Sequence, residues 1–301
     1  MGKIYRLYQI DSFTTKRFTG NPAGVITNAD GLTPSEMQQI ARELNNSETA
    51  FIFTENCEDC DMHVRFFTPT REVPICGHAT IAAHYANALE KNMQGHNRVF
   101  QKTGAGTLPV DIYRENDDYR IAMTQGEIKI EEPLSAEYQE QIMAALGLTM
   151  DQLTEDVPMA VASTGHSKLM IRIRDLERLH GLQPDLPALA RLSSAVGCNG
   201  YYVFTLTPNE DPMVHGRMFS PAGGIPEDPV TGNANGPLGA YLVHLGFADA
   251  AKDEFSFHIV QGEAIGRTGG MEVKVSISDG KPVQVQIFGR AVVAFSTEVE
   301  I

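Results

Sequence analysis

The sequence contains an imperfect internal repeat whose two copies begin half a chain apart. Residues 67–80 (FTPTREVPICGHAT) return at residues 219–234 as FSPAGGIPEDPVTGNA, in a chain of 301 residues. Both copies read Phe-x-Pro, four further residues and a second Pro, and later a Gly followed by a polar residue and Ala. Two weaker similarities precede these copies in the same order. Residues 19–26 resemble residues 164–171, and residues 48–53 resemble residues 199–204. Self-similarity of this kind predicts two similarly folded halves.

The boundary between the halves is expected in the polar stretch 127–139. We therefore predict an N-terminal half of residues 1–130 and a C-terminal half of residues 131–301, leaving open that the chain crosses back near its C-terminus. The length suits this division, because each half is large enough to bury its own core.

Hydrophobic periodicity predicts the elements within each half. Residues 34–45 place apolar side chains at helical spacing behind Pro34 and Ser35, which is typical of an amphipathic helix. Residues 78–91 and 233–246 are apolar almost all round, which suits helices buried on every side. Five segments alternate with period two and predict antiparallel strands: 99–102, 107–113, 119–125, 271–277 and 282–289. The expected fold class is α+β, with a curved, mostly antiparallel sheet around one central helix in each half.

Charge and cysteine content limit the class of partner and the compartment. With 24 Lys and Arg against 38 Asp and Glu, the net charge of −14 disfavours a nucleic-acid or membrane-surface partner. We expect no signal peptide and no spanning helix, and four cysteines are too few for a disulfide framework, so we predict a cytoplasmic protein. Cys57 and Cys60 with His63 suggest zinc, but a second cysteine pair is missing, so no metal is expected.

Each predicted buried helix begins directly after a Gly-containing turn, at Gly77 and at Gly232. Helix N-termini offer unpaired N–H groups and a partial positive charge, so these two ends could hold a carboxylate or a developing oxyanion. The alternative is that both glycines are ordinary turn residues.

Three ionisable side chains near these turns are candidates for acid–base chemistry. Glu48 begins an apolar strand, where partial burial would raise its pKa, although a surface pair with Arg42 is the alternative. Asp228 precedes the second helix, where it could equally stabilise the helix dipole. His78 lies in the first turn of the other helix, as a proton shuttle or as a satisfied core residue. The repeat position of Glu48 is Asn199, so the fold does not need this carboxylate twice.

Seven separated motifs, spread in order over both halves, resemble the PhzF-like family of phenazine biosynthesis, and look closest to the uncharacterised PhzF-like isomerases of enteric bacteria. The motifs are GNPAGV (20–25), NNSETAF (45–51), FTPTREVPICGHAT (67–80), CNGYYVF (198–204), RMFSP (217–221), EDPVTGNANGP (227–237) and QGEAIGR (261–267). The resemblance implies a diaminopimelate epimerase-like fold, with two pseudo-symmetric halves and the active site in the cleft between them. It also implies a homodimer and a cofactor-independent isomerase of a small carboxylated metabolite.

The resemblance also assigns roles to residues of this chain. It implies that Glu48 moves the proton, that His78 and Asp228 position the substrate or relay protons, and that Gly77 and Gly232 donate backbone N–H groups to a substrate carboxylate.

Three neighbouring positions bear on the substrate and on the rival mechanisms. Asn233 stands where the phenazine enzymes have Ser, so the substrate could differ. The related epimerases use a cysteine before each helix glycine, whereas this chain has Cys76 but Thr231, and a hydroxyl is too weak an acid to replace a thiol. Two alternatives stay open: a PLP-independent amino-acid racemase or epimerase using Cys76 with a non-thiol partner, and a non-catalytic protein that binds small anions.

Overall fold

The computed structural model describes residues 2–54, 59–249 and 251–301. The chain divides into two compact units. The first comprises Met1–Thr124 together with Phe288–Ile301, and the second comprises Gln125–Ile287. Residues 288–301 belong to the first unit because strand β17 (Lys281–Glu300) pairs antiparallel with β1 (Ile4–Ser12) through its C-terminal part. The second unit of this division begins at Gln125, whereas the predicted C-terminal half begins at residue 131.

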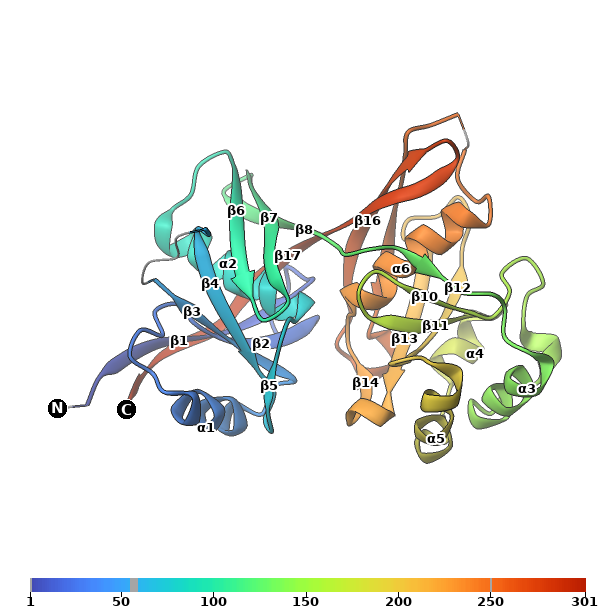
Figure 1. Cartoon of the computed structure of the whole chain (residues 1–301), viewed down its shortest axis with the longest axis horizontal. Coiled ribbons are helices and arrows are strands. Elements are labelled where there is room, and N and C mark those ends of the chain that lie inside the picture. Colours follow the sequence, from blue (N-terminus) through green and yellow to red (C-terminus); the bar gives the residue numbers. More distant parts are fainter. Residues whose placement is uncertain (1, 55–58, 250) are drawn as a thin grey trace. The chain divides into compact units, whose positions relative to one another are not determined.

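The first unit is a curved sheet around one buried helix, α2 (Figure 1). Its strands pair antiparallel except for β2 with β3 and β4 with β6, which pair parallel. Helix α2 contacts β2, β3 and β8. Besides β1 and the end of β17, the elements are β2 (Asn21–Ile26), α1 (Pro34–Leu44), β3 (Glu48–Phe53), β4 (Met62–Phe67), β5 (Glu72–Val73), α2 (Gly77–Lys91), β6 (His96–Thr103), β7 (Gly106–Glu115) and β8 (Asp118–Thr124).

The second unit repeats this arrangement around helix α6, which confirms the predicted fold class of two pseudo-symmetric halves (Figure 1). Strands β11 and β12 pair parallel, as β2 and β3 do, and β13 and β15 pair parallel, as β4 and β6 do. The elements are β9 (Lys129–Ile130), α3 (Ala136–Ala145), η1 (Met150–Gln152), β10 (Ala160–Ser163), β11 (Ser167–Arg172), α4 (Leu176–His180), α5 (Leu186–Val196), β12 (Tyr201–Leu206), β13 (Val214–Ser220), η2 (Pro221–Gly223), β14 (Ile225–Asp228), α6 (Gly232–His244), β15 (Glu254–Gln261), η3 (Glu263–Ile265) and β16 (Gly269–Ser278).

No residue range was predicted for helices α3, α4 and α5. Helix α5 lies between β11 and β12, the place that α1 has between β2 and β3, so it belongs to the repeat. The sequence carries its start signal, because the side chain of Asp185 accepts a hydrogen bond from the backbone N–H of Ala188. Asp175 caps α4 in the same way, through the N–H of Arg178.

The central helix of the second unit packs closely against its sheet. The side chains of Ala234, Leu238 and Leu242 are fully buried. A Cβ atom added to Gly239 would lie 2.7 Å from Val273 Cγ1 and 2.9 Å from a methyl carbon of Val275, both on β16. Glycine at this position therefore lets the helix approach the strand closely. None of the described helices is long and apolar enough to span a membrane.

Candidate active site

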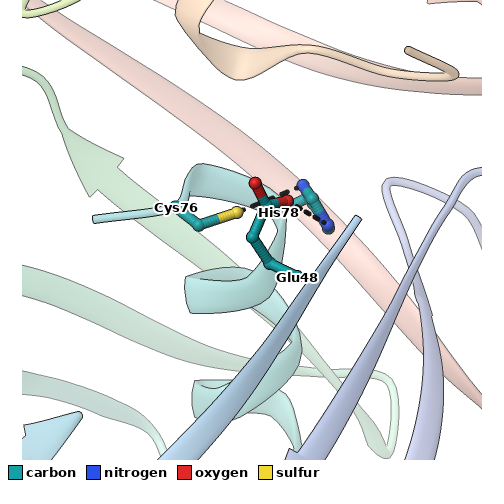
Figure 2. Close-up of side chains that lie close together, drawn as sticks. All are labelled: Glu48, Cys76 and His78. Atoms are coloured by element: carbon teal, nitrogen blue, oxygen red, sulfur yellow. Dashed lines mark hydrogen bonds and ion pairs between the residues drawn. The ribbon is translucent and has the colours of Figure 1, made fainter. Parts of the chain in front are cut away.

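Three of the predicted site residues meet at the start of α2 in the first unit (Figure 2). Glu48 is the first residue of β3 and is held there by its parallel pairing with Ala23 of β2. Cys76 is the N-cap of α2, and His78 lies in the first turn of the helix. Glu48 Oε2 lies 3.5 Å from His78 Nε2, and Cys76 Sγ lies 3.4 Å from His78 Nδ1.

Burial raises the pKa of the Glu48 carboxyl above its ordinary value, because the charged form loses its hydration. Hydrogen bonds from the side chains of Cys76 and Ser47 act in the opposite direction and are outweighed. The Glu48 side chain keeps 15% of its surface exposed, so a ligand can reach it. A carboxyl with a raised pKa is a stronger base than an ordinary carboxyl, and it can return the proton that it accepts. The surface pair with Arg42 is wrong, because Glu48 is largely buried and contacts His78 instead.

The side chain and the backbone of His78 each contact a neighbouring serine. Its Nε2 lies 3.2 Å from Ser47 Oγ, and Ser12 Oγ donates a hydrogen bond of 2.8 Å to the His78 carbonyl oxygen. The ring is 7% exposed.

The two helix glycines differ in their surroundings. A Cβ atom at Gly77 would meet no heavy atom within 4 Å in the described part of the chain, so the start of α2 is open beside Glu48. A Cβ atom at Gly232 would lie 2.4 Å from Ile287 Cδ1, so the start of α6 is closely packed. Neither glycine has a positive φ, so the turn geometry does not by itself require glycine at either position.

The remaining predicted site residues lie in the second unit, around the start of α6. Thr231 is the N-cap of α6, and its Oγ1 donates a hydrogen bond to Asp228 at the end of β14. Gln261 Nε2 donates to the Asp228 carbonyl oxygen at 2.8 Å and to Thr231 Oγ1 at 3.1 Å. Asp228 and Thr231 are both buried, and Asn233 is half-buried in the first helical turn. Gln261 belongs to the motif at residues 261–267, but the sequence predicts no role for it.

Lys168 of β11 is a buried cation that sequence reasoning missed. It is 5% exposed, and its Nζ donates to the carbonyl oxygen of Ser167 at 3.3 Å. Burial lowers the pKa of Lys168 to about 8, while the negative charge of Asp228 acts in the opposite direction. Lys168 is buried because of the way β11 packs in the sheet. The sequence around Lys168 does not predict this burial.

Two clusters of possible metal ligands in the first unit include a cysteine. Glu48, Cys76 and His78 offer ligand atoms within 4.8 Å of one another, which is compatible with a metal ion. Cys76 is buried and forms no disulfide. In the other group, Cys60 is disulfide-bonded and therefore offers no thiolate, while Cys57 lies outside the described residues. His63 stacks on Phe53 with ring centroids 5.3 Å apart.

Comparisons with known proteins agree with the fold. The chain belongs to the PhzC-PhzF family, described as phenazine biosynthesis-like proteins, whose model matches residues 10–297. It is 59% identical to an uncharacterized isomerase of Clostridium acetobutylicum over 99% of both chains. It is 47% identical to the uncharacterized isomerase YddE of Escherichia coli K12 over 97% of both chains. The isomerases of enteric bacteria, to which the sequence motifs looked closest, are thus among the relatives of this chain. The chain is an isomerase.

Two further relatives extend the comparison. The trans-2,3-dihydro-3-hydroxyanthranilate isomerase of Pseudomonas chlororaphis is 30% identical to this chain, over 94% of this chain and 95% of that protein. The crystal structure of a PhzF-family phenazine biosynthesis protein of Bacillus anthracis superposes with a TM-score of 0.89 at 31% identity, covering 99% of this chain and 100% of the other.

Proposed function

We propose that this isomerase moves a proton between two positions of one small carboxylated metabolite, without a bound cofactor, and that Glu48 is the general acid and base. The observation that carries the proposal is the Glu48 carboxyl itself. It is largely buried, its pKa is raised, and it lies 3.5 Å from His78 Nε2 beside the open start of α2.

The proposed step needs no redox partner. The Glu48 carboxylate takes a proton from a carbon next to an unsaturated or carbonyl group, and the electron pair of the broken C–H bond moves into that group. The protonated Glu48 then returns the proton to another carbon on the same face, so substrate and product have the same composition. N–H groups at the start of α2, from Gly77 onward, stabilise the negative charge that develops in between.

We propose supporting roles for the residues around the two helix starts. His78 orients the Glu48 carboxyl or relays its proton, which their contact supports. Asp228, held by Thr231 and Gln261, positions the substrate. The N–H groups at Gly232 and Asn233 donate hydrogen bonds to the carboxylate of the substrate.

A second candidate function is favoured by the position of Cys76. Its sulfur lies 3.4 Å from His78 Nδ1, and its thiol donates a hydrogen bond to Glu48. In an amino-acid racemase, the Cys76 thiolate would take the proton from one face of the α-carbon, and a non-thiol acid on the opposite face would return a proton. This route differs from the first because it requires Cys76 for turnover.

Hydrogen exchange and product formation decide between these functions. Wild type, Glu48→Gln and Cys76→Ser are incubated in D₂O with small carboxylates that include trans-2,3-dihydro-3-hydroxyanthranilate and common amino acids, and products are followed by mass spectrometry and NMR. Turnover by wild type and Cys76→Ser but not by Glu48→Gln supports the proton shuttle. Inversion at an α-carbon by wild type, together with loss of turnover in both variants, supports the racemase. A substrate that binds tightly to wild type without exchange or product would support the anion-binding protein instead.

The homodimer and the cytoplasmic location stay predictions.

A further inference from the structure

A second cluster of possible metal ligands lies in the second unit and has no part in the proposed proton transfer. It consists of His180, His215 and Glu263, whose ligand atoms all lie within 4.8 Å of one another. We propose that this cluster binds a divalent transition-metal ion such as zinc.

The distances within the cluster fit a shared ion. Glu263 Oε2 lies 3.1 Å from His180 Nε2 and 2.9 Å from His215 Nδ1. In a tetrahedral zinc site with bonds of about 2.1 Å, neighbouring ligand atoms lie about 3.4 Å apart. Small side-chain rotations would therefore let all three atoms reach one ion. Two histidines and one glutamate form a donor set that holds zinc while leaving a fourth position for water.

The three ligands come from separate elements that are fixed to one another. His180 ends α4, and His215 lies on β13. Arg217, two residues after His215 and 6% exposed, donates from Nη1 to the carbonyl oxygens of Leu179, His180 and Leu182 at 2.9 to 3.1 Å. This guanidinium thereby ties the end of α4 to β13. A site whose backbone is fixed before the ion arrives loses less conformational freedom on binding.

The third ligand is placed by a tight turn. Glu263 follows Gly262, whose φ of +82° is unfavourable for residues with a side chain. A Cβ atom at Gly262 would also lie 2.4 Å from the Arg267 carbonyl oxygen. Because β15 pairs parallel with β13, with Val260 opposite His215, the turn that ends β15 brings Glu263 back over the histidine.

The exposure of the ligands leaves room for water on one side of the ion. The His215 side chain is 14% exposed, Glu263 is 28% exposed and His180 is 37% exposed. His215 thus forms the inner wall and His180 the rim. The rival interpretation is a purely hydrogen-bonded cluster, in which both imidazoles donate to the same carboxylate oxygen and no metal binds.

Cobalt binding distinguishes these interpretations, because Co²⁺ replaces zinc and reports its ligands by visible absorption. The full chain, free of any affinity tag and stripped with chelator, is titrated with Co²⁺. We expect one ion per chain, with the visible bands of a nitrogen and oxygen site and without the near-ultraviolet band of a cobalt–thiolate bond. His180→Ala and Glu263→Gln should weaken binding at least about tenfold, since even the loss of a group that supports a ligand typically costs that much.

Matched variants of the first cluster serve as controls. Glu48→Gln and Cys76→Ser should bind cobalt as wild type does. Binding that is lost in Cys76→Ser, or that shows a thiolate band, would assign the ion to the first cluster and overturn the proposal. Wild type that binds no cobalt or zinc at millimolar concentration, or full binding by both His180→Ala and Glu263→Gln, would overturn it as well.

Thermal unfolding checks that the variants are folded. His180 is more than one-third exposed, so its replacement should leave the fold intact even if a variant at the more buried His215 does not. Zinc should raise the Tm of wild type and of Cys76→Ser more than that of His180→Ala, because an ion that binds only the folded state stabilises it in proportion to its affinity. An equal rise in His180→Ala would count against the site.

Discussion

Glu48 Oε2 lies 3.5 Å from His78 Nε2, although the two residues come from different elements, β3 and α2. The other ring nitrogen of His78 faces the sulfur of Cys76 at 3.4 Å. One imidazole thus connects a carboxyl and a thiol. Burial is the main cause of the raised pKa of Glu48, so the carboxyl is tuned by its surroundings and not by one charged neighbour.

Replacing Glu48 by Gln should abolish proton transfer. The amide keeps the shape of the carboxyl but cannot carry the proton, and acid–base groups of this kind contribute about 10²-fold or more to the rate. The measurement is kcat on the substrate found in the exchange screen, with circular dichroism as the control for folding. Turnover within tenfold of wild type would remove Glu48 from the role of base.

The same substitution should also change stability in a pH-dependent way. The folded-state pKa of Glu48 is raised above the ordinary value of 4.5. Wild type therefore loses stability as the pH rises from the ordinary pKa through the folded-state pKa. Glu48→Gln has no such loss, and we expect it to be more stable than wild type at pH 7. The gain should shrink on acidification and vanish below about pH 4. Denaturant unfolding at pH 4 and 7 tests this, and a gain of equal size at both values would contradict it.

Lys168 should titrate well below an ordinary lysine. Burial lowers its pKa from 10.5 to about 8, so the amine loses its proton as the pH rises through that value. Asp228→Asn should lower the pKa further, because it removes the opposing negative charge. Side-chain NMR of labelled lysine measures both values, and Lys168→Met identifies the signal. A midpoint near 10.5 in wild type would show that the amine is hydrated.

Two glycine-to-alanine substitutions should separate function from packing. Gly239→Ala places a methyl group against the two valines of β16 and should cost about 1–3 kcal/mol of unfolding free energy. Gly77→Ala meets no atom within 4 Å in the described chain, so it should leave stability unchanged within about 0.5 kcal/mol. It should nevertheless weaken substrate binding by narrowing the open start of α2. Equal stability of the two variants, or unchanged KM in Gly77→Ala, would count against this interpretation.

The features that sequence reasoning found are those with a local signature. Helices α2 and α6 are apolar all round, and the repeated Pro and Gly positions mark their starts, so both were predicted within one residue at the N-terminus. Lys168 and Gln261 were missed because their burial and partners depend on strands far apart in sequence. His180, His215 and Glu263 come from three elements, and no spacing in the sequence indicates that they meet.

The path of β17 has a consequence for biosynthesis. Its C-terminal part, residues 291–300, pairs with β1, yet those residues leave the ribosome after the whole second unit has been made. Until then the nascent first unit has an unpaired β1 edge, and such edges invite wrong pairing between chains. A cut near residue 130 would likewise leave an N-terminal fragment without its closing strand. The unit that carries Glu48 and His78 is therefore the first to be synthesised and the last to be completed.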